Sequence, residues 1–425
     1  MDDRGNPSRP SSAIARKDAV PVDRLPGVLY LEHGVSFGGA NVSLIQTVAH
    51  CEQTHPIVVT LRPIRELTSI HLPENATFIT LRSFADYSRR GRWLEPIALR
   101  FGKKRLYWVA SKSYALLDSA NDWFLLRQLT AIVKRYRVGL IHCNNNVTLL
   151  SYRLARRTRL PLIYHFRGPD NYRQYPEAVA HASAYVSISS ALTQLYSKQL
   201  GIAKERFTLI PDPVDLAPFE TSENQDRATR LRQQTGCDDP VIVSITGRVM
   251  AFKGQMHVLN ACLDLMERHP NLRLWIIGDG GDGSAAYLQE LMRHASGSGH
   301  GGRVVFWGYQ AHVVPFLLAS DIIVNASVGL EGFGRSVAEG FAAGRAVIST
   351  AIGGPLDLVH HEGTGLLVAP NDAGELRAAI ERLLTEPELR SRLARAGHDF
   401  CRRHLAGHKA AGSIEALQVK LMSSP

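Results

Sequence analysis

The run Asp321-Ile-Ile-Val-Asn-Ala-Ser327 is apolar, and Glu331-Gly-Phe-Gly-Arg-Ser-Val-Ala-Glu339 follows it along the chain. We expect a strand, a glycine-rich turn and then a helix that continues to about Ala343. Such a junction directs backbone N–H groups and the positive end of a helix dipole at one point, which suits a phosphate-bearing ligand. Glu331 precedes the helix and Glu339 lies inside it, so they are not an i,i+4 surface pair. They can hold two parts of one elongated ligand.

Similar units flank this one on both sides. Strands that are apolar throughout alternate with helices, which is typical of parallel sheets covered on both faces. The sequence therefore predicts an α/β fold with two doubly wound domains, and ligands bind such sheets at the carboxyl ends of the strands. The expected strands are 27–35, 57–61, 138–143, 161–165, 184–189 and 207–210 in the first half, and 241–245, 272–277, 303–307, 321–326, 346–350 and 365–368 in the second.

A chain of 425 residues is long enough for two domains with separate cores. We expect residues 1–26 to be a disordered lead-in and residues 27–215 to form an N-terminal Rossmann-like domain. The polar stretch 216–240 is the expected linker, and residues 241–400 are the expected C-terminal Rossmann-like domain. Residues 401–425 are expected to form a helix that can pack back on the N-terminal domain.

Composition favours a cytoplasmic protein. The five cysteines form no C-x-x-C pair, which argues against a disulfide framework or a zinc site. No apolar run approaches the roughly 18 residues that a membrane span needs. Residues 81–160 hold 17 Lys and Arg against four acidic residues, with aromatic residues between them. An anionic membrane or lipid-linked acceptor is the favoured partner; a solvated basic face is the next alternative, and nucleic acid is the weakest because no binding signature accompanies the charge.

Two further loops suit phosphate binding. Arg248 and Lys253, flanked by glycines, follow the first strand of the second half, and a guanidinium and an ammonium can neutralise a diphosphate. Gly38 and Gly39 are the matching loop of the first half, where missing side chains let a ligand approach the backbone. His165 ends a strand, so substrate contact and a structural role both stay open. The absence of Ser-His-Asp, H-E-x-x-H and P-loop patterns argues against hydrolase, metalloprotease and P-loop functions.

Together these residues resemble the retaining glycosyltransferases of family 4, which have the GT-B fold of two Rossmann-like domains with an interdomain cleft. The loops above appear in family order. Two residues depart from the family pattern: Asn41 stands where many members carry an acidic residue, and Asp357 stands where Glu is commoner. The matching features are Gly38 and Gly39, Ile210–Asp215, Arg248 with Lys253, Ile277–Gly280, Glu331 with Glu339, Gly353 and Gly354, and the run 365–370.

The resemblance implies a sugar transfer from a nucleoside-diphosphate sugar to a hydroxyl of a glycan, glycolipid or lipid-linked acceptor, in polysaccharide or glycolipid biosynthesis. It implies that the first domain binds the acceptor and the second the donor. The implied roles are the diphosphate for Arg248 and Lys253, sugar hydroxyls for Glu331, ribose for Glu339, the nucleobase for Tyr309, the donor sugar for His165, and backbone contacts to sugar and phosphate around Phe333, Gly334 and Arg335.

In the front-face scheme attributed to the family, the leaving phosphate helps to deprotonate the acceptor. The resemblance therefore implies neither a protein base nor a metal or other cofactor. Two alternatives stay open: a nucleotide-sugar epimerase or hydrolase on the same fold, and a non-catalytic nucleotide-sugar binding module. We expect a cytoplasmic enzyme, with peripheral attachment to the inner face of the cytoplasmic membrane as the extension that the basic region suggests.

Overall fold

A computed structural model describes residues 25–33, 38–61, 72–82, 121–144, 147–170, 175–281 and 284–423. The lead-in expected at 1–26 falls almost wholly outside these ranges, and so does 83–120, nearly half of the basic region. Within them, no helix has both the length and the apolar character that a bilayer crossing requires.

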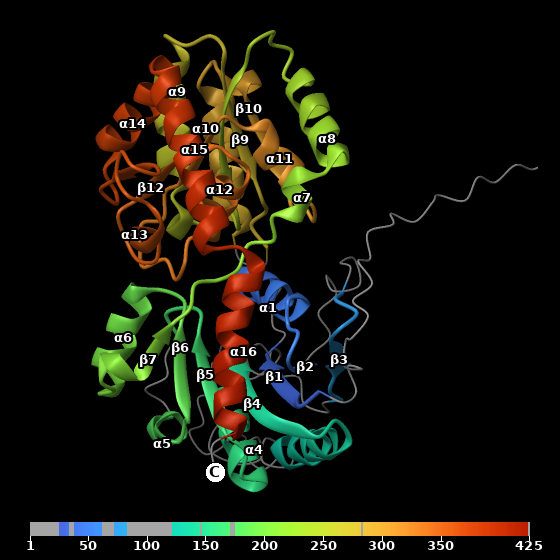
Figure 1. The fold of residues 1–425 in the computed structure, drawn as a ribbon. Helices are drawn as coiled ribbons and strands as arrows, with labels where there is room; N and C mark the ends of the chain where they lie inside the picture. The colour runs from blue at the N-terminus through green and yellow to red at the C-terminus, as the bar shows by residue number, and fades with distance from the viewer. Residues whose placement is uncertain are drawn as a thin grey trace, which may run out of the picture.

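The first half of the chain forms a parallel sheet with the strand order β3-β2-β1-β4-β5-β6-β7. Helices cover both faces, and Figure 1 shows this unit below the second one. Its strands are β1 (Gly27–Glu32), β2 (His55–Thr60), β3 (Thr77–Thr80), β4 (Val138–Asn144), β5 (Leu162–Phe166), β6 (Ala184–Ser187) and β7 (Phe207–Leu209). Its helices are α1 (Gly39–Ala49), a helix at 121–135, α4 (Thr148–Thr158), α5 (Pro176–Ala180), α6 (Ser190–Leu200) and the short η4 (Lys204–Arg206).

The second half forms another parallel sheet, with the order β10-β9-β8-β11-β12-β13. Both sheets reverse their strand order beside their first strand, which defines a switch point in each. The strands are β8 (Val241–Thr246), β9 (Leu272–Ile277), β10 (Val304–Gly308), β11 (Ile322–Asn325), β12 (Ala346–Thr350) and β13 (Leu366–Val368). The helices are α7 (Ala217–Glu220), α8 (Ser222–Gln233), η5 (Ala251–Lys253), α9 (Gln255–Met266), α10 (Ala285–Gly297), η6 (Gly301–Arg303), α11 (Val314–Ala319), α12 (Arg335–Ala342), α13 (Pro355–Leu358), α14 (Ala373–Thr385) and α15 (Pro387–His404).

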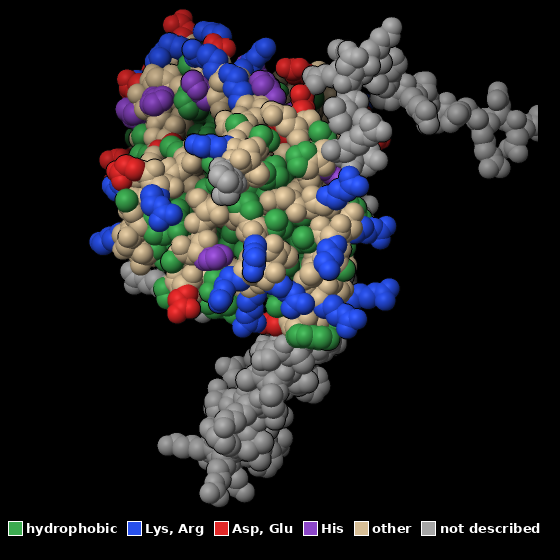
Figure 2. All heavy atoms as spheres, turned by 60° about the horizontal axis from the view of Figure 1, so that its bottom comes forward, with side chains coloured by type: hydrophobic (Ala, Val, Ile, Leu, Met, Phe, Trp, Pro, Cys, Tyr) green, Lys and Arg blue, Asp and Glu red, His purple; other side chains and the backbone are tan. Residues whose placement is uncertain are grey.

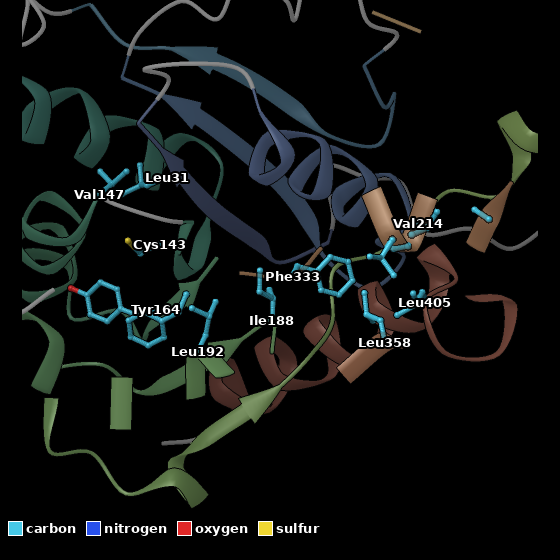
Figure 3. Close-up of a cluster of buried hydrophobic side chains, with 14 of the residues drawn as sticks. Leu31, Cys143, Val147, Tyr164, Ile188, Leu192, Val214, Phe333, Leu358 and Leu405 are labelled. Carbon is cyan, nitrogen blue, oxygen red and sulfur yellow. The ribbon is translucent and has the colours of Figure 1, made fainter. Parts of the chain in front are cut away.

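One apolar cluster continues from the first half into the second. Figure 3 shows Phe333 and Leu358 of the second half close to Ile188 and Val214 of the first, with Leu405 beside them. Each of these side chains is at most 4% exposed. The burial of apolar surface, about 25 cal/mol per Å², therefore holds the two halves together as well as each sheet to its helices.

The chain crosses between the halves twice, and the two crossings are hydrogen-bonded to each other. The Val214 N–H donates to the Leu405 carbonyl at 2.8 Å, and the Gly407 N–H donates to the Val214 carbonyl at 3.1 Å. After the second crossing, α16 (Gly407–Ser423) runs along the face of the first sheet (Figure 1). The buried Glu415 carboxylate accepts from the backbone N–H groups of 52–54, each at 2.9 Å, and ties this helix to the loop after α1.

The observed elements differ from the expected ones in three places. β1 ends at Glu32, before the expected end at residue 35, and β3 was not expected at all. β3 is a four-residue strand at the edge of the sheet, too short to give a periodic signal. The stretch expected as a linker is largely helical, because α7 and α8 occupy it; Arg232 of α8 donates to the Asp321 carboxylate and ties this stretch to the second sheet.

Candidate active site

The candidate donor residues lie on loops at the carboxyl ends of the second sheet. β8 and β11 are neighbours at its switch point; the loop after β8 carries Arg248 with Lys253, and the loop after β11 carries Glu331 and leads into α12, which carries Glu339. Open parallel sheets bind ligands at this position because the connecting loops leave a crevice there. Residues 78 positions apart in the chain thereby become neighbours.

Two glycines fix these loops against one another. Gly254 has φ 71°, and a Cβ there would lie 2.1 Å from the carbonyl oxygen of Ala326. Gly353 has φ 74°, and a Cβ there would lie 2.2 Å from the carbonyl oxygen of Glu331. Left-handed backbone in direct contact with another backbone segment admits only glycine. The Lys253 loop, the Glu331 loop and the turn after β12 are therefore packed main chain to main chain.

Lys253 and Glu331 form an ion pair between these two loops. The Lys253 ammonium lies 2.5 Å from the Glu331 carboxylate, and the Ser327 hydroxyl donates to the same carboxylate at 2.7 Å. The side chains are 26% and 15% exposed, so the pair lies at the edge of solvent and not in the core. A ligand that reaches it can offer the cation a phosphate and the carboxylate a hydroxyl.

Arg335 and Glu339 form a second pair on the first turn of α12. Arg335 binds the Glu339 carboxylate at 2.9 Å, and its guanidinium also donates to Ser43 at 2.9 Å and to the Pro213 carbonyl at 3.3 Å. Ser43 and Pro213 belong to the first half, so this side chain bridges the two halves. We had expected only backbone contacts to a ligand around Arg335; the interdomain bridge of its side chain is not visible in the sequence pattern.

The remaining expected residues of the second half lie on neighbouring loops. Arg248 is exposed after β8, and Tyr309, 52% exposed, follows β10. The loops are joined through the turn after β9, because the Val249 N–H donates to the Asp279 carbonyl at 2.7 Å and the Gly278 N–H donates to the Gly308 carbonyl at 2.9 Å. Backbone bonds thus hold the loops of Arg248 and Tyr309 side by side.

The turn before α12 separates side chain from backbone. Phe333 buries its ring, 4% exposed, in the apolar cluster between the halves. Gly334 is the N-cap residue with φ 93°, and α12 begins at Arg335. Glu339 is accordingly one turn inside the helix. Phe333 and Gly334 can therefore contact a ligand at this helix N-terminus only through their backbone.

The glycine loop of the first half meets this region directly. Gly38 is the N-cap residue of α1, and a Cβ on Gly39 would lie 3.1 Å from the Arg335 side chain. A Cβ on Gly332 would lie 2.7 Å from the carbonyl oxygen of Arg167, in the first half. The two halves are in close contact at the carboxyl ends of both sheets.

A buried polar network at the ends of the first-half strands was missed at the level of sequence. The Arg167 guanidinium pairs with the Asp212 carboxylate, and the Ser43 hydroxyl donates to the same carboxylate at 2.8 Å. Asn144, at the end of β4, accepts from Arg167 and donates to Glu32, at the end of β1, each at 2.5 Å. All five residues are at most 7% exposed. Four of them share one signal, a polar residue at or just after the end of an apolar strand, whereas Ser43 lies within α1.

His165 lies on β5 beside this network. It is 2% exposed and hydrogen-bonds through Nδ1 to Nε2 of His142 at 3.0 Å. Burial lowers the pKa of His165 well below its ordinary value, and the nearby Arg167 and His142 add to the effect. His165 is therefore neutral near pH 7, suited to hydrogen bonding and not to charge pairing. Its link to the second half runs through Arg167, which meets Gly332.

Among the described residues, no group of three or more His, Cys, Asp and Glu side chains is arranged to hold a metal ion. Arg248 and Lys253 are the two cations at this edge for which the sequence predicts diphosphate binding.

Two family models match the chain, one on each half. The model for Glycosyltransferase Family 4 matches residues 38–218, and the model for Glycosyl transferases group 1 matches residues 227–400. The two matches meet close to the first crossing between the halves.

Individual relatives agree with this pattern. The lipopolysaccharide core biosynthesis glycosyltransferase LpsE of Rhizobium meliloti is 33% identical over 46% of this chain, and the match spans about half, 53%, of that relative. The 2-deoxystreptamine glucosyltransferase of Streptomyces kanamyceticus is 25% identical over 75% of this chain and 80% of its own. Among solved structures, Anabaena HepE in complex with UDP has a TM-score of 0.74 at 20% identity, over 93% of this chain and 100% of that one. This last likeness identifies the fold as GT-B.

Proposed function

This chain belongs to the group 1 glycosyltransferases of family 4, and from that premise we propose that it transfers a sugar from a UDP-sugar to a hydroxyl of a glycan or glycolipid. The proposed donor rests on HepE, solved with UDP and with UDP-glucose. The proposed acceptor class rests on LpsE, whose name places it in lipopolysaccharide core biosynthesis.

One observation carries the proposal most strongly: two partly exposed ion pairs flank one glycine turn at the switch point of the second sheet. A sugar nucleotide presents a diphosphate between two polyhydroxylated rings. The cations match the diphosphate, and the carboxylates match hydroxyls, which donate hydrogen bonds to them. The spacing of Glu331 and Glu339 on either side of the helix N-terminus supports a ligand that extends across it.

In the proposed complex, Arg248 and Lys253 bind the diphosphate and stabilise the charge that develops on it as the sugar departs. Glu331 receives hydroxyls of the transferred sugar and Glu339 receives those of the ribose. The backbone of Phe333 and Gly334 approaches the sugar and phosphate at the start of α12. Tyr309 contacts the base, His165 contacts the sugar, and Gly38 and Gly39 admit the ligand on the opposite wall.

The transfer needs no nucleophile from the protein in this proposal. The bond between the anomeric carbon and the phosphate oxygen breaks while the acceptor oxygen bonds to that carbon on the same face, and the leaving phosphate oxygen takes the acceptor proton, so configuration is retained. Metal independence remains a prediction: an excess of EDTA should leave the initial rate of transfer unchanged, and a loss of rate that Mg²⁺ restores would contradict it.

The donor assignment is tested by isothermal titration with UDP-, GDP- and ADP-glucose. We expect the tightest binding for UDP-glucose, and a Glu339→Ala variant should bind it about tenfold more weakly, as the loss of a charged hydrogen bond predicts. With an analogue of UDP-glucose that lacks the ribose 3′-hydroxyl, the Glu339→Ala variant and the unsubstituted protein should bind equally well, because the hydroxyl that Glu339 contacts is absent. If the Glu339→Ala variant still bound the analogue about tenfold more weakly than the unsubstituted protein does, Glu339 would not contact the ribose.

The two alternatives make different predictions about turnover. An epimerase or hydrolase consumes the donor without an acceptor, whereas a binding module leaves it intact under all conditions. We expect donor consumption to depend on added glycolipid acceptor. Acceptor-independent turnover at the same rate would overturn the transferase assignment.

A membrane surface is the proposed location of the acceptor. Eight Lys and Arg residues between 121 and 160 are exposed, and Asp122, the acidic residue among them, pairs with Arg153. Figure 2 shows Lys and Arg side chains gathered at this end of the molecule. Trp123, 59% exposed, lies under the guanidinium of Arg127. Exposed aromatic and basic side chains together suit an anionic headgroup layer. About half of the basic region lies outside the described residues, so this proposal rests on the described half.

Vesicle flotation tests the proposal. The protein should float with phosphatidylglycerol vesicles at low salt and not with phosphatidylcholine vesicles. Salt at about 0.5 M should release it, because that ionic strength screens the attraction between the basic side chains and the anionic headgroups. Arg156→Glu with Arg157→Glu should abolish flotation, whereas Lys204→Glu with Arg230→Glu, exposed elsewhere, should not. Equal flotation of both variants would reject this surface.

A further inference from the structure

A chain of buried hydrogen bonds connects the last described helix to His165. The Gln418 amide nitrogen donates to the Tyr30 hydroxyl at 2.8 Å and to Nδ1 of His142 at 3.0 Å. Nε2 of His142 then lies 3.0 Å from Nδ1 of His165. These four side chains are at most 2% exposed. Gln418 is on α16, His142 on β4 and His165 on β5, so the relay crosses from the covering helix through the sheet residues to the strand end.

The orientation of the Gln418 amide follows from what each alternative leaves unpaired. With the nitrogen toward Tyr30 and His142, the amide oxygen lacks a partner in the described structure. With the amide reversed, both N–H groups would be the buried unpaired atoms. Buried N–H groups without partners are rarer than under-satisfied carbonyl oxygens. The amide therefore acts as the donor.

This orientation determines the protons of both histidines. Burial lowers the pKa of His142 to about 3, with Arg167 adding to the effect, so the ring is neutral and carries a single N–H. Its Nδ1 accepts from Gln418, which puts the hydrogen on Nε2, and Nε2 donates to Nδ1 of His165. The hydrogen of His165 then resides on its Nε2.

The relay ends in an unpaired donor. Nε2 of His165 is buried and has no hydrogen-bond partner among the described atoms. The residue lies near the carboxyl end of β5, two positions before Arg167, whose carbonyl is in contact with Gly332 of the donor loop. A buried N–H in this place is satisfied only when an oxygen acceptor arrives.

We propose that Gln418 is a positioning residue, which acts through His142 to hold His165 as the Nε2–H tautomer so that it donates to an oxygen of the nucleotide sugar. The inference rests on the proposed function and deepens it, because it makes a helix outside the donor domain a determinant of donor binding. The oxygen is a sugar hydroxyl or a phosphate oxygen, and the binding arms below distinguish the two.

The first measurement is the tautomer itself, which ¹⁵N NMR of the histidine rings reports without any ligand. The unsubstituted protein should show His165 protonated on Nε2. Gln418→Glu replaces the donor by an acceptor, so the relay should reverse and His165 should be protonated on Nδ1. Tyr30→Phe removes the other bond of the same amide and should leave the tautomer unchanged. If the glutamate variant does not fold, Gln418→Met keeps the volume and should give a mixture of both tautomers.

The second measurement is binding of UDP and of UDP-glucose to the same variants. A reversed His165 should weaken UDP-glucose about tenfold, as one lost buried hydrogen bond predicts. Unchanged binding of UDP identifies a sugar hydroxyl, and an equal loss for UDP identifies a phosphate oxygen. His165 protonated on Nδ1 in the unsubstituted protein, or unchanged affinity for both ligands in the reversed variant, would overturn the proposal. Failure of the unsubstituted protein to bind any UDP-sugar would instead overturn the proposed function and leave the tautomer result standing.

Discussion

The two halves of this protein use ion pairs in different ways at the same edge of their sheets. In the second half, the Lys253–Glu331 and Arg335–Glu339 side chains are 14–26% exposed and lie on the loop after β8, the loop after β11 and the start of α12. In the first half, Arg167 and Asp212 are 2% and 4% exposed, and neighbouring polar groups complete their hydrogen bonds. A ligand can take the first kind of pair apart at little cost, because water already reaches it. The second kind is fixed, since separating it would leave buried charges. Under the proposed function, the pairs of the second half would exchange partners with the donor, whereas the buried pair of the first half would support them.

The largest expected effect breaks the fixed pair. Asp212→Ala leaves the Arg167 guanidinium buried without its carboxylate, and we expect the free energy of unfolding to fall by about 3–5 kcal/mol. Asp215→Ala, three positions later, removes a half-buried carboxylate that accepts from the Ala217 N–H, and should cost about 1 kcal/mol. Urea denaturation of both variants measures the difference. Similar losses in the two would show that Arg167 finds another partner.

The second prediction concerns the exchangeable pair. Lys253→Ala should lower kcat about 10²–10³-fold, because the cation stabilises charge on the leaving diphosphate, while thermal unfolding stays nearly unchanged. Lys204→Ala, an exposed lysine of the first half, is the matched control and should behave as the unsubstituted protein. Initial rates of transfer decide the matter. A Lys253 variant with full activity would remove that residue from the site.

A third, smaller effect comes from the neutral histidines of the first half. The pKa of His142 is about 3 in the folded protein and ordinary in the unfolded one, so only the unfolded chain takes up this proton as pH falls below about 6.5. Folding stability is therefore complete above that pH and decreases below it, by about 2 kcal/mol between pH 6 and pH 4.5. The folding stability of His142→Gln should fall by about 2 kcal/mol less over the same pH range. His181→Gln, at an exposed site, should lose as much stability as the unsubstituted protein. Denaturation at a series of pH values provides the test.

The smallest expected effect is at a second contact between the halves. Asp357 of α13 accepts from the Ser190 N–H at 2.7 Å, at the start of α6, and the contact is exposed. Asp357→Ala should cost about 0.5–1 kcal/mol, as the loss of an exposed helix cap does. Glu388→Ala, in the exposed first turn of α15, should cost less still. A loss above about 2 kcal/mol, measured by calorimetry, would mean that this contact and not Arg335 dominates the junction.

The donor side was largely predictable because its chemistry is local in sequence. Glu331 and Glu339 share one strand–turn–helix unit, and Arg248 and Lys253 share one loop. The spacing of each pair in the sequence therefore indicates that its members lie close together. The doubly wound architecture was equally accessible, since apolar strands and helices alternate in both halves, whereas the strand order was not predicted from the sequence.

The support of the first half was not predictable in the same way. Glu32, Asn144, Arg167 and Asp212 come from four separate strand ends, and their contact depends on register and topology. Arg335 bridges 292 residues to Ser43, and Gln418 lies 276 residues from His142. No periodicity or motif spacing encodes contacts at that separation; only the assembled sheets bring them together.

The path of α16 bears on how the protein is made. Glu415 binds backbone groups 361 to 363 residues earlier in the chain. During synthesis, the first sheet is complete before α16 is made, and the whole second domain emerges from the ribosome in between. Roughly 200 residues separate the end of β7 from α16, so at about 5–20 residues per second that delay lasts on the order of 10–40 seconds. The nascent first sheet therefore exposes an apolar face for that interval, and chaperone occupancy should peak before translation ends.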